Sequence, residues 1–359
     1  MATVNIHQIL TFAVQNKVSD IHFQVGVPPL LRRKGELIAV KHAVLTEDDT
    51  LFIGQHLSGI SNTEVFKRDV HEYDGSFMIP GIGRFRVNVF RQRGQYAAVL
   101  RVIPLEIKDF AELGLPAALE RVAKLQRGLV LVTGATGNGK STTLAAILNY
   151  INTHRRVHII TIEDPMEFVF EHKLSVVSQR EVGPDTESFR TALRAALRQD
   201  PDVIMVGELR DHETVDICLK AAETGHLVLS SVHTPDATRT VGRLLNFFPV
   251  EEQTSVRQRI AENLMAIVSL RLLNHADGSG DIPACEILFV TRTIEECIKQ
   301  PEKNDEIPQH IARNRDLGMQ TFNQSLVDLV RAKRITLAVA KAASSQPDEL
   351  ERDLMVDGA

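Results

Sequence analysis

A glycine-rich segment near the middle of the chain has the residue types and spacing of a phosphate-binding loop. It fits the pattern GxxxxGK[ST] in full and lies between a predicted strand and a predicted helix, which is the context that the pattern requires. Glycines let the backbone wrap a phosphate closely, and successive N–H groups bind the anion together with the helix N-terminus. We expect Lys140 to reach the β- and γ-phosphates, Ser141 to ligate Mg²⁺ and Thr142 to support the helix start. The predicted nucleotide-binding residues are Gly134, Ala135, Thr136, Gly137, Asn138, Gly139, Lys140, Ser141 and Thr142.

Two predicted strands end in carboxylates that suit nucleotide chemistry. Glu163 closes an apolar run at 159–162, and Glu208 follows another at 203–206. Ligands of open α/β sheets bind at the carboxyl ends of strands, so the topology places both carboxylates near the glycine-rich loop. One of them could hold Mg²⁺ or its waters, and the other could orient and deprotonate an attacking water. The alternative is that each is an ordinary surface acid at a strand end.

Two histidines frame the apolar run at 227–232. His226 and His233 are seven residues apart, which is roughly 23 Å at about 3.3 Å per residue of a regular strand. They therefore cannot both touch one γ-phosphate unless the strand ends early or bends. We expect His233, at the carboxyl end, to sense the phosphate, and His226 to be structural or to face an interface. A purely structural role is the alternative for His233.

An arginine pair is predicted on one face of a strand in the first hundred residues. The segment Gly81-Ile-Gly-Arg-Phe-Arg-Val-Asn-Val-Phe indicates a turn followed by an alternating strand. Because strand side chains alternate between faces, Arg84 and Arg86 share the face opposite to Phe85 and Val87. An arginine from a neighbouring subunit can stabilise the transition state of phosphoryl transfer. A solvated or salt-bridged edge strand is the alternative for this pair.

The elements that must position the loop, the acids and the histidines form an α/β pattern after Pro116. Helical patterns at 188–199 and 211–223 lie between apolar, β-branched runs, which occur at 129–133, 157–162, 174–177, 203–206 and 227–232. Such alternation predicts a mainly parallel sheet with helices on both faces. Residues from about 251 onward are predicted to be mostly helical, with a loop at 300–309. The acidic end from Pro347 is predicted to be frayed.

Proline and glycine interruptions predict two domains. The first hundred residues mix a helix at about 5–17 with β-like segments, and Pro104 and Gly114-Leu-Pro116 then interrupt the chain. We predict an N-terminal domain at 1–104, a linker at 105–116 and a nucleotide-binding domain at 117–359, which includes C-terminal helices and the acidic tail.

The composition excludes several classes of protein. The 359 residues are 43% hydrophobic and 24% charged, which is ordinary for a globular chain. The net charge of -5 gives no global attraction to nucleic acid or anionic lipid. We see no secretory signal and no apolar run near the roughly 20 residues that span a bilayer. Three scattered cysteines without a CxxC pair favour free thiols in a reducing compartment over disulfides or a thiolate zinc site.

Four ordered segments resemble the Walker A, Asp, Walker B and His boxes of the secretion-superfamily (GspE-type) ATPases. They are residues 134–141, 161–168, 200–211 and 222–234. Ser19-Asp-Ile-His-Phe, the arginine-rich segment at 83–93 and Leu317-Gly-Met-Gln-Thr-Phe are similar to the type IV pilus retraction ATPases, the PilT/PilU branch of that superfamily. The resemblance covers roughly residues 5–345. The motif Ala-Ile-Arg-Asn-Leu-Ile-Arg-Glu of that branch is not legible, and residues 309–316 echo it only faintly.

The resemblance implies a PAS-like N-terminal domain, a RecA-like ATPase domain and a homohexamer that binds ATP and Mg²⁺ between subunits. It implies that Glu163 is the general base, that Glu208 is the Walker B acid and Mg²⁺ ligand, that His226 and His233 form the His box, and that Arg84 and Arg86 approach the nucleotide. It also implies pilin removal at the cytoplasmic base of a pilus machine, against an inner-membrane platform protein and beside a possible paralogous retraction ATPase. Membrane contact is expected only through partners, and no nucleic acid is expected.

Three other functions remain as alternatives. One is an accessory or low-activity ATP-binding ring that needs a partner motor. A second is a pilus-assembly or type II secretion ATPase, whose usual paired-cysteine zinc module and longer N-terminus are not found here. A nucleic-acid motor shares the RecA-like core, but the acidic balance of the chain counts against it.

Overall fold

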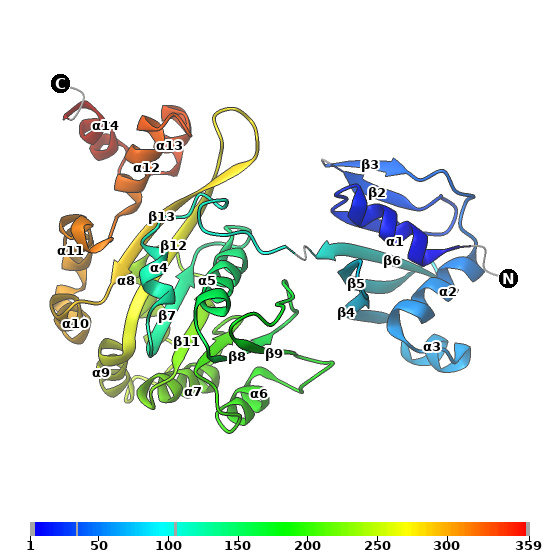
Figure 1. Cartoon of the computed structure of the whole chain (residues 1–359), viewed down its shortest axis with the longest axis horizontal. Helices are drawn as coiled ribbons and strands as arrows, with labels where there is room; N and C mark the ends of the chain where they lie inside the picture. Colours follow the sequence, from blue (N-terminus) through cyan, green and yellow to red (C-terminus); the bar gives the residue numbers. More distant parts are fainter. Residues whose placement is uncertain (1–3, 34, 104–105, 357–359) are drawn as a thin grey trace. The chain divides into compact units, whose positions relative to one another are not determined.

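The computed structural model describes residues 4–33, 35–103 and 106–356, and the chain divides into two compact units (Figure 1). One unit consists of Met1–Glu106 with Pro165–Val169, and the other consists of Ile107–Asp164 with Phe170–Ala359. The predicted domain boundary at 104 and the first residue of the predicted linker lie outside the described residues. Within the described ranges, no helix has the length and hydropathy needed to cross a membrane.

The N-terminal unit is built on an antiparallel sheet of six described strands in the order β3-β2-β1-β6-β5-β4. The strands are β1 (Asp20–Phe23), β2 (Leu30–Arg33), β3 (Glu36–Ala39), β4 (Glu72–Ile79), β5 (Gly83–Gln92) and β6 (Gln95–Ile103). The helices are α1 (Ile6–Gln15), α2 (Glu47–Ser58) and α3 (Thr63–Asp69). Each helix begins after a polar side chain that accepts a backbone N–H of the first turn, which satisfies one otherwise unpaired donor.

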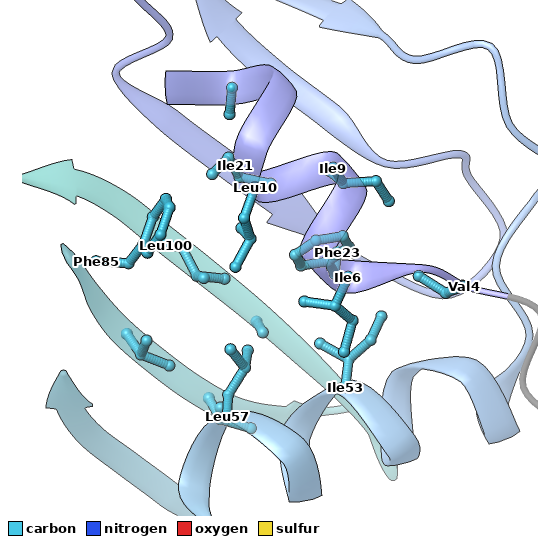
Figure 2. Close-up of a cluster of buried hydrophobic side chains, with 14 of the residues drawn as sticks. Val4, Ile6, Ile9, Leu10, Ile21, Phe23, Ile53, Leu57, Phe85 and Leu100 are labelled. Atoms are coloured by element: carbon cyan, nitrogen blue, oxygen red, sulfur yellow. The ribbon is translucent and has the colours of Figure 1, made fainter. Parts of the chain in front are cut away.

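The core of this unit lies between the sheet and its helices. Figure 2 shows Leu10 of α1, Phe23 of β1, Ile53 of α2 and Leu100 of β6 meeting in one cluster. All four side chains are fully buried. The predicted alternation along β5 places Phe85 in this cluster as well, because every second residue of the strand faces the helices.

The second unit is built on a sheet of seven described strands in the order β13-β12-β7-β11-β10-β8-β9. All neighbouring pairs are parallel except β12 and β13. The strands are β7 (Gly128–Thr133), β8 (His158–Glu163), β9 (Val176–Glu181), β10 (Val203–Val206), β11 (Leu227–Val232), β12 (Leu264–Asn274) and β13 (Asp281–Phe289). The predicted mainly parallel α/β sheet is therefore present, and the strand expected at 174–177 begins two residues later.

Helices connect and extend these strands. The α-helices are α4 (Leu119–Ala123), α5 (Lys140–His154), α6 (Phe189–Ala196), α7 (His212–Glu223), α8 (Ala237–Leu245), α9 (Gln253–Asn263), α10 (Arg292–Lys299), α11 (Ile307–Arg313), α12 (Phe322–Arg331), α13 (Leu337–Ala343) and α14 (Pro347–Val356). Two 3₁₀ helices, η1 (Pro301–Glu306) and η2 (Arg315–Leu317), precede and follow α11.

The prediction that residues beyond about 251 are mostly helical is wrong for two strands. β12 lies in the sheet between β7 and β13, and β13 is the antiparallel strand at the sheet's edge. Residues 264–270 of β12 are mostly buried, and all of them except Ser269 are apolar. Such a run does not distinguish a buried strand from a buried helix by its period, which explains the error.

The expected loop at 300–309 is also wrong, and so is the expected frayed tail for residues 347–356, whereas residues 357–359 lie outside the described residues. Pro301 and Pro308 lie in the first turns of η1 and α11, where the missing proline N–H would have no helical partner anyway. The tail forms α14, which lies beside α12 and α13 (Figure 1). Leu350 of α14 is fully buried in a cluster with residues of α12 and α13. Leu350 and Leu354 are four residues apart and so share one helix face, which the acidic composition concealed.

We predict that Leu350→Ala releases α14 from its neighbours. Removing a fully buried leucine costs about 2–5 kcal/mol, and this cost should lower the free energy of local opening of α14. Native-state hydrogen exchange of the α14 amides measures it. Met355 on the same helix is 74% exposed, so Met355→Ala is the control and should change the opening by less than about 0.5 kcal/mol. If the α14 amides were equally protected from hydrogen exchange in both variants, α14 would not depend on the packing of Leu350.

Candidate nucleotide site

The loop between β7 and α5 has a backbone that requires glycine. Gly134, Gly137 and Gly139 have φ values of 145°, 84° and 83°, which side-chain-bearing residues rarely adopt. A Cβ atom on Gly134 would lie 2.7 Å from the backbone oxygen of Leu270. Residues 135–137 are exposed, and a Cβ atom on Gly137 would have no other atom within 4 Å. The conformation thus fits a loop that wraps an anion at the start of a helix.

Asn138 fastens this loop to the neighbouring strand β12. Its amide nitrogen donates to the backbone oxygen of Leu270 at 3.0 Å, and its amide oxygen accepts the N–H of Leu272 at 3.5 Å. A hydroxyl bridge lies close by, where Thr133 Oγ1 donates to Ser269 Oγ at 2.8 Å. The sequence predicts Asn138 as a nucleotide-binding residue of the loop, and this contact with β12 was not predicted because that segment was expected to be helical.

Lys140 is the first residue of α5 and its side chain turns back over the loop. Its Nζ atom donates to the backbone oxygens of Gly134 at 3.0 Å and Ala135 at 3.1 Å, and lies 3.4 Å from Nδ1 of His233. The lysine is only 9% exposed. A concentrated positive charge is therefore held at the loop, within reach of a bound phosphate.

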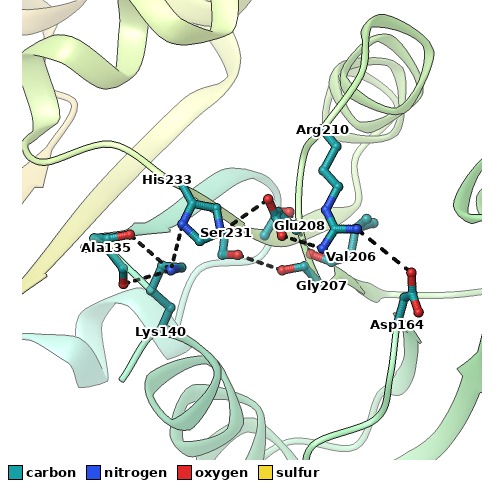
Figure 3. A network of polar contacts seen from close by, with 11 residues as sticks. Ala135, Lys140, Asp164, Val206, Gly207, Glu208, Arg210, Ser231 and His233 are labelled. Atoms are coloured by element: carbon teal, nitrogen blue, oxygen red, sulfur yellow. Dashed lines mark hydrogen bonds and ion pairs between the residues drawn. The ribbon is translucent and has the colours of Figure 1, made fainter. Parts of the chain in front are cut away.

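A line of alternating charges leads from Lys140 across the ends of three strands (Figure 3). His233, directly after β11, lies between Lys140 and Glu208, with Nε2 3.3 Å from a Glu208 oxygen. Glu208, beyond the end of β10, also pairs with Arg210 at 3.0 Å, and Arg210 lies 3.9 Å from Asp164 after β8. The hydrogen bond to Glu208 raises the pKa of Arg210, so this guanidinium stays charged. Arg210 and Asp164 were not singled out from the sequence, although both lie in quoted motif segments.

Glu163 is the last residue of β8 and is 7% exposed. Its carboxylate accepts hydrogen bonds from Thr161 Oγ1 at 2.7 Å and from Gln179 Nε2 at 3.3 Å. Gln179 is fixed in turn, since its amide oxygen accepts the N–H of Phe170 at 2.8 Å. These two neighbours therefore hold the carboxylate in one orientation.

The two histidines lie at opposite ends of β11, as the sequence predicts. Nδ1 of His226 lies 3.0 Å from the backbone oxygen of Ala221 and 3.2 Å from Thr224 Oγ1, at the amino end of the strand. His233 lies at the carboxyl end beside Lys140. The structure thus brings His233 to the loop and gives His226 local contacts with the end of α7.

The arginine pair lies on β5, in the N-terminal unit. Arg84 and Arg86 share a strand face, but Arg84 is only 9% exposed and donates to Ser76 Oγ of β4 at 2.8 Å, whereas Arg86 is exposed. Both belong to the unit that does not carry the glycine-rich loop, so their approach to a nucleotide stays a prediction.

The available oxygen atoms match the ligand preference of Mg²⁺. Ser141 follows Lys140 at the start of α5 and is partly exposed, and Glu208 supplies a carboxylate at the same sheet edge. Hydroxyl, carboxylate and phosphate oxygens are the hard ligands that this ion takes. The residues present therefore fit a nucleotide with its magnesium ion.

Glu286 of β13 holds the turn that follows His233. Its carboxylate accepts the N–H of Ala237, the first residue of α8, at 2.8 Å. Burial raises the pKa of Glu286 to about 7; the hydrogen bond from Ala237 and the charge of Arg271 oppose the shift, and Asp236 adds to it. A protonated Glu286 is thus the favoured form in the folded unit at mildly acidic pH.

We predict that Glu286 makes stability fall as pH rises. Between its ordinary pKa of 4.5 and the folded-state value of about 7, the folded unit keeps a proton that the unfolded chain loses. The free energy of unfolding should drop by about 3 kcal/mol across this window. Glu286→Gln removes the titration, so this variant should gain about 3 kcal/mol over the parent between about pH 4.5 and pH 8. Urea denaturation of parent and variant at both pH values measures the free energy of unfolding. The prediction is contradicted if the variant differs from the parent by the same amount at both pH values.

Three comparisons relate this geometry to known proteins. The family model described as type II/IV secretion system protein matches residues 76–334. The type IV pilus retraction ATPase PilT of Pseudomonas aeruginosa is 40% identical over 345 residues, which cover 96% of this chain and 99% of PilT. The type IV pilus ATPase PilU of the same species is 39% identical over 350 residues, which cover 97% of this chain and 90% of PilU.

A solved structure supports the fold as well as the sequence match. The crystal structure of the pilus retraction motor PilT with bound ADP has a TM-score of 0.88 and 44% identity, and the match covers 97% of this chain and 99% of that one. The second unit accordingly has the RecA-like ATPase fold and follows an N-terminal domain. The chain therefore belongs to the type II/IV secretion system protein family and, within it, to the ATPases represented by PilT.

Proposed function

We propose that this ATPase is a hexameric motor that hydrolyses ATP between subunits and powers type IV pilus retraction, the removal of pilin that underlies twitching motility. The observation that carries the proposal is the convergence of Lys140, His233 and Glu208 at the carboxyl edge of the sheet, beside the glycine-rich loop. Near-complete coverage of PilT supports the assignment to retraction. The same proposal places the motor at the cytoplasmic base of the pilus machine, against an inner-membrane platform protein.

The loop and α5 bind the phosphates of ATP in this proposal. N–H groups at the start of α5 face the anion, and Lys140 exchanges the backbone oxygens of Gly134 and Ala135 for β- and γ-phosphate oxygens. Ser141 and Glu208 would hold Mg²⁺, which would neutralise charge on the phosphates. His233 already touches both Lys140 and Glu208, so a change at the γ-phosphate reaches the end of β11 through it.

Glu163 is the proposed general base. It orients a water toward the γ-phosphorus and accepts its proton as the new P–O bond forms and the bond to ADP breaks. Thr161 and Gln179 keep the carboxylate in place for that step. His226 is given a structural role at the far end of β11, because its contacts are to Ala221 and Thr224.

The N-terminal unit supplies the remaining charge in the proposed ring. Its antiparallel sheet order, with strands 3-2-1 beside 6-5-4, supports a PAS-like domain. Arg86 and Arg84 would approach ATP from the neighbouring subunit, and the exposed Arg86 is ready to do so. Arg84 must first exchange its hydrogen bond to Ser76. In this proposal both arginines belong to a domain at 1–104, which a linker at 105–116 joins to the ATPase domain at 117–359.

We predict that Glu163→Gln binds ATP but hydrolyses it slowly. The amide keeps the shape and accepts from Thr161, yet it cannot take a proton, so turnover should fall by about 10²–10⁴-fold. Steady-state phosphate release and equilibrium nucleotide binding measure the two effects. Glu171→Gln, at an exposed position on the same connection, is the matched control and should keep parental turnover. Parental turnover in Glu163→Gln would assign the base elsewhere.

We predict that cells lacking this gene carry excess pili that do not retract. Complementation with the parent chain should restore the pilus number, and complementation with Lys140→Ala should not, because the phosphate contact is lost. Electron microscopy of pilus number and twitching assays measure the outcome. Bald cells would mean an assembly motor instead. An unchanged number would favour an accessory ring beside a paralogue such as PilU, and a double deletion would then decide.

A further inference from the structure

Three side chains that ligate transition metals converge between α10, η1 and α11, in the ATPase unit. They are Cys297 of α10, Glu306 at the end of η1 and His310 of α11. One ligand atom from each lies within 4.8 Å of the other two, and Nε2 of His310 lies 3.8 Å from a Glu306 oxygen. Two ligands of one tetrahedral ion, with bonds of about 2.0–2.3 Å, are roughly 3.3–3.8 Å apart. Small side-chain rotations therefore bring the three atoms to coordination distance.

The surroundings of this cluster favour a cation. Cys297 is 2% exposed, and burial raises the pKa of its thiol; the carboxylates of Glu306 and Glu296 add to the shift, while Lys303 opposes it. Two carboxylates thus face the sulfur against one ammonium.

We propose that Cys297, Glu306 and His310 form a site for a divalent transition metal ion, with a water as the fourth ligand. Sulfur, imidazole nitrogen and carboxylate oxygen together match Zn²⁺, whereas Mg²⁺ takes oxygen ligands. On binding, the metal–sulfur bond forms and the thiol proton is released to solvent. The site joins α10 to α11 and is separate from the nucleotide site. Its ligands come from a CxxxxxxxxExxxH segment and not from paired cysteines.

The site predicts that affinity increases with pH, because the metal ion must displace the thiol proton before sulfur can bind. It also predicts that the ion stabilises the folded chain by mass action, since the three ligands are close together only in the folded unit. The alternative arrangement is a core cysteine next to an ordinary surface pair of glutamate and histidine.

Cobalt titration of the full, tag-free chain tests the proposal. After chelator treatment, Co²⁺ should produce a thiolate-to-cobalt charge-transfer band that saturates at one ion per chain and disappears when Zn²⁺ is added. Excess Mg²⁺ is kept present, and Co²⁺ at the phosphate loop would give no such band because Ser141 and Glu208 offer only oxygen. Cys297→Ala should abolish the band, and Glu306→Gln and His310→Gln should each weaken binding at least about tenfold.

Matched variants keep the test decisive. Cys218→Ala changes another buried cysteine, on α7, and should leave the band unchanged. Glu306 and His310 are exposed and partly exposed, so their variants decide the question even if Cys297→Ala folds poorly. The proposal is overturned if the parent shows no thiolate band in a large excess of Co²⁺. It is also overturned if the band persists in Cys297→Ala, or if binding is unchanged in both Glu306→Gln and His310→Gln.

Discussion

The parallel register of four central strands is the constraint on which the ATPase unit depends. β7, β11, β10 and β8 are neighbours that run in the same direction, so their carboxyl ends share one edge of the sheet. The pairing of Val232 with Thr133 puts His233 beside the start of the glycine-rich loop. The pairing of Val206 with Ile162 likewise puts Gly207 opposite Glu163, and Glu208 follows one residue later at the same edge. A shift of one residue in any of these pairs would turn the side chains to the other face and separate the groups.

Hydroxyl contacts keep that register at the ends of the strands. Ser230 and Ser231 of β11 donate to the backbone oxygens of Val206 and Gly207 at 2.6 and 2.7 Å. These oxygens lie where β10 ends. A buried backbone oxygen without a donor would cost about 1–3 kcal/mol, so the two serines stabilise the point at which the chain turns to Glu208. The position of Glu208 thus depends on hydrogen bonds to the backbone of the two residues before it.

The sequence predicts the positions of the site residues better than their partners. The pattern of the loop and the carboxylates after apolar runs predicts one edge of a parallel sheet, because that conclusion needs only strand direction. The hydrogen bonds of Glu163 to Gln179 and of Asn138 to β12 join residues 16 and 132 positions apart, which no local pattern reveals. β12 itself was missed because its buried run lacks a distinguishing period. Burial of Arg84 was also missed, since alternation assigns a face but not what covers it.

β12 links the phosphate loop to the C-terminal helices, and this explains why the unit continues beyond its parallel core. The backbone of Leu270 and Leu272 bonds to Asn138 of the loop. Arg271 between them stacks over Phe322 of α12, 3.9 Å from the ring centre, and donates to the backbone oxygen of Ala343 at the end of α13. Leu270, Arg271 and Leu272 are consecutive, so one short stretch of β12 contacts the phosphate loop on one side and α12 and α13 on the other. Strand side chains alternate between faces, and this lets the backbone of Leu270 and Leu272 bond to Asn138 while the side chain of Arg271 reaches Phe322 and Ala343.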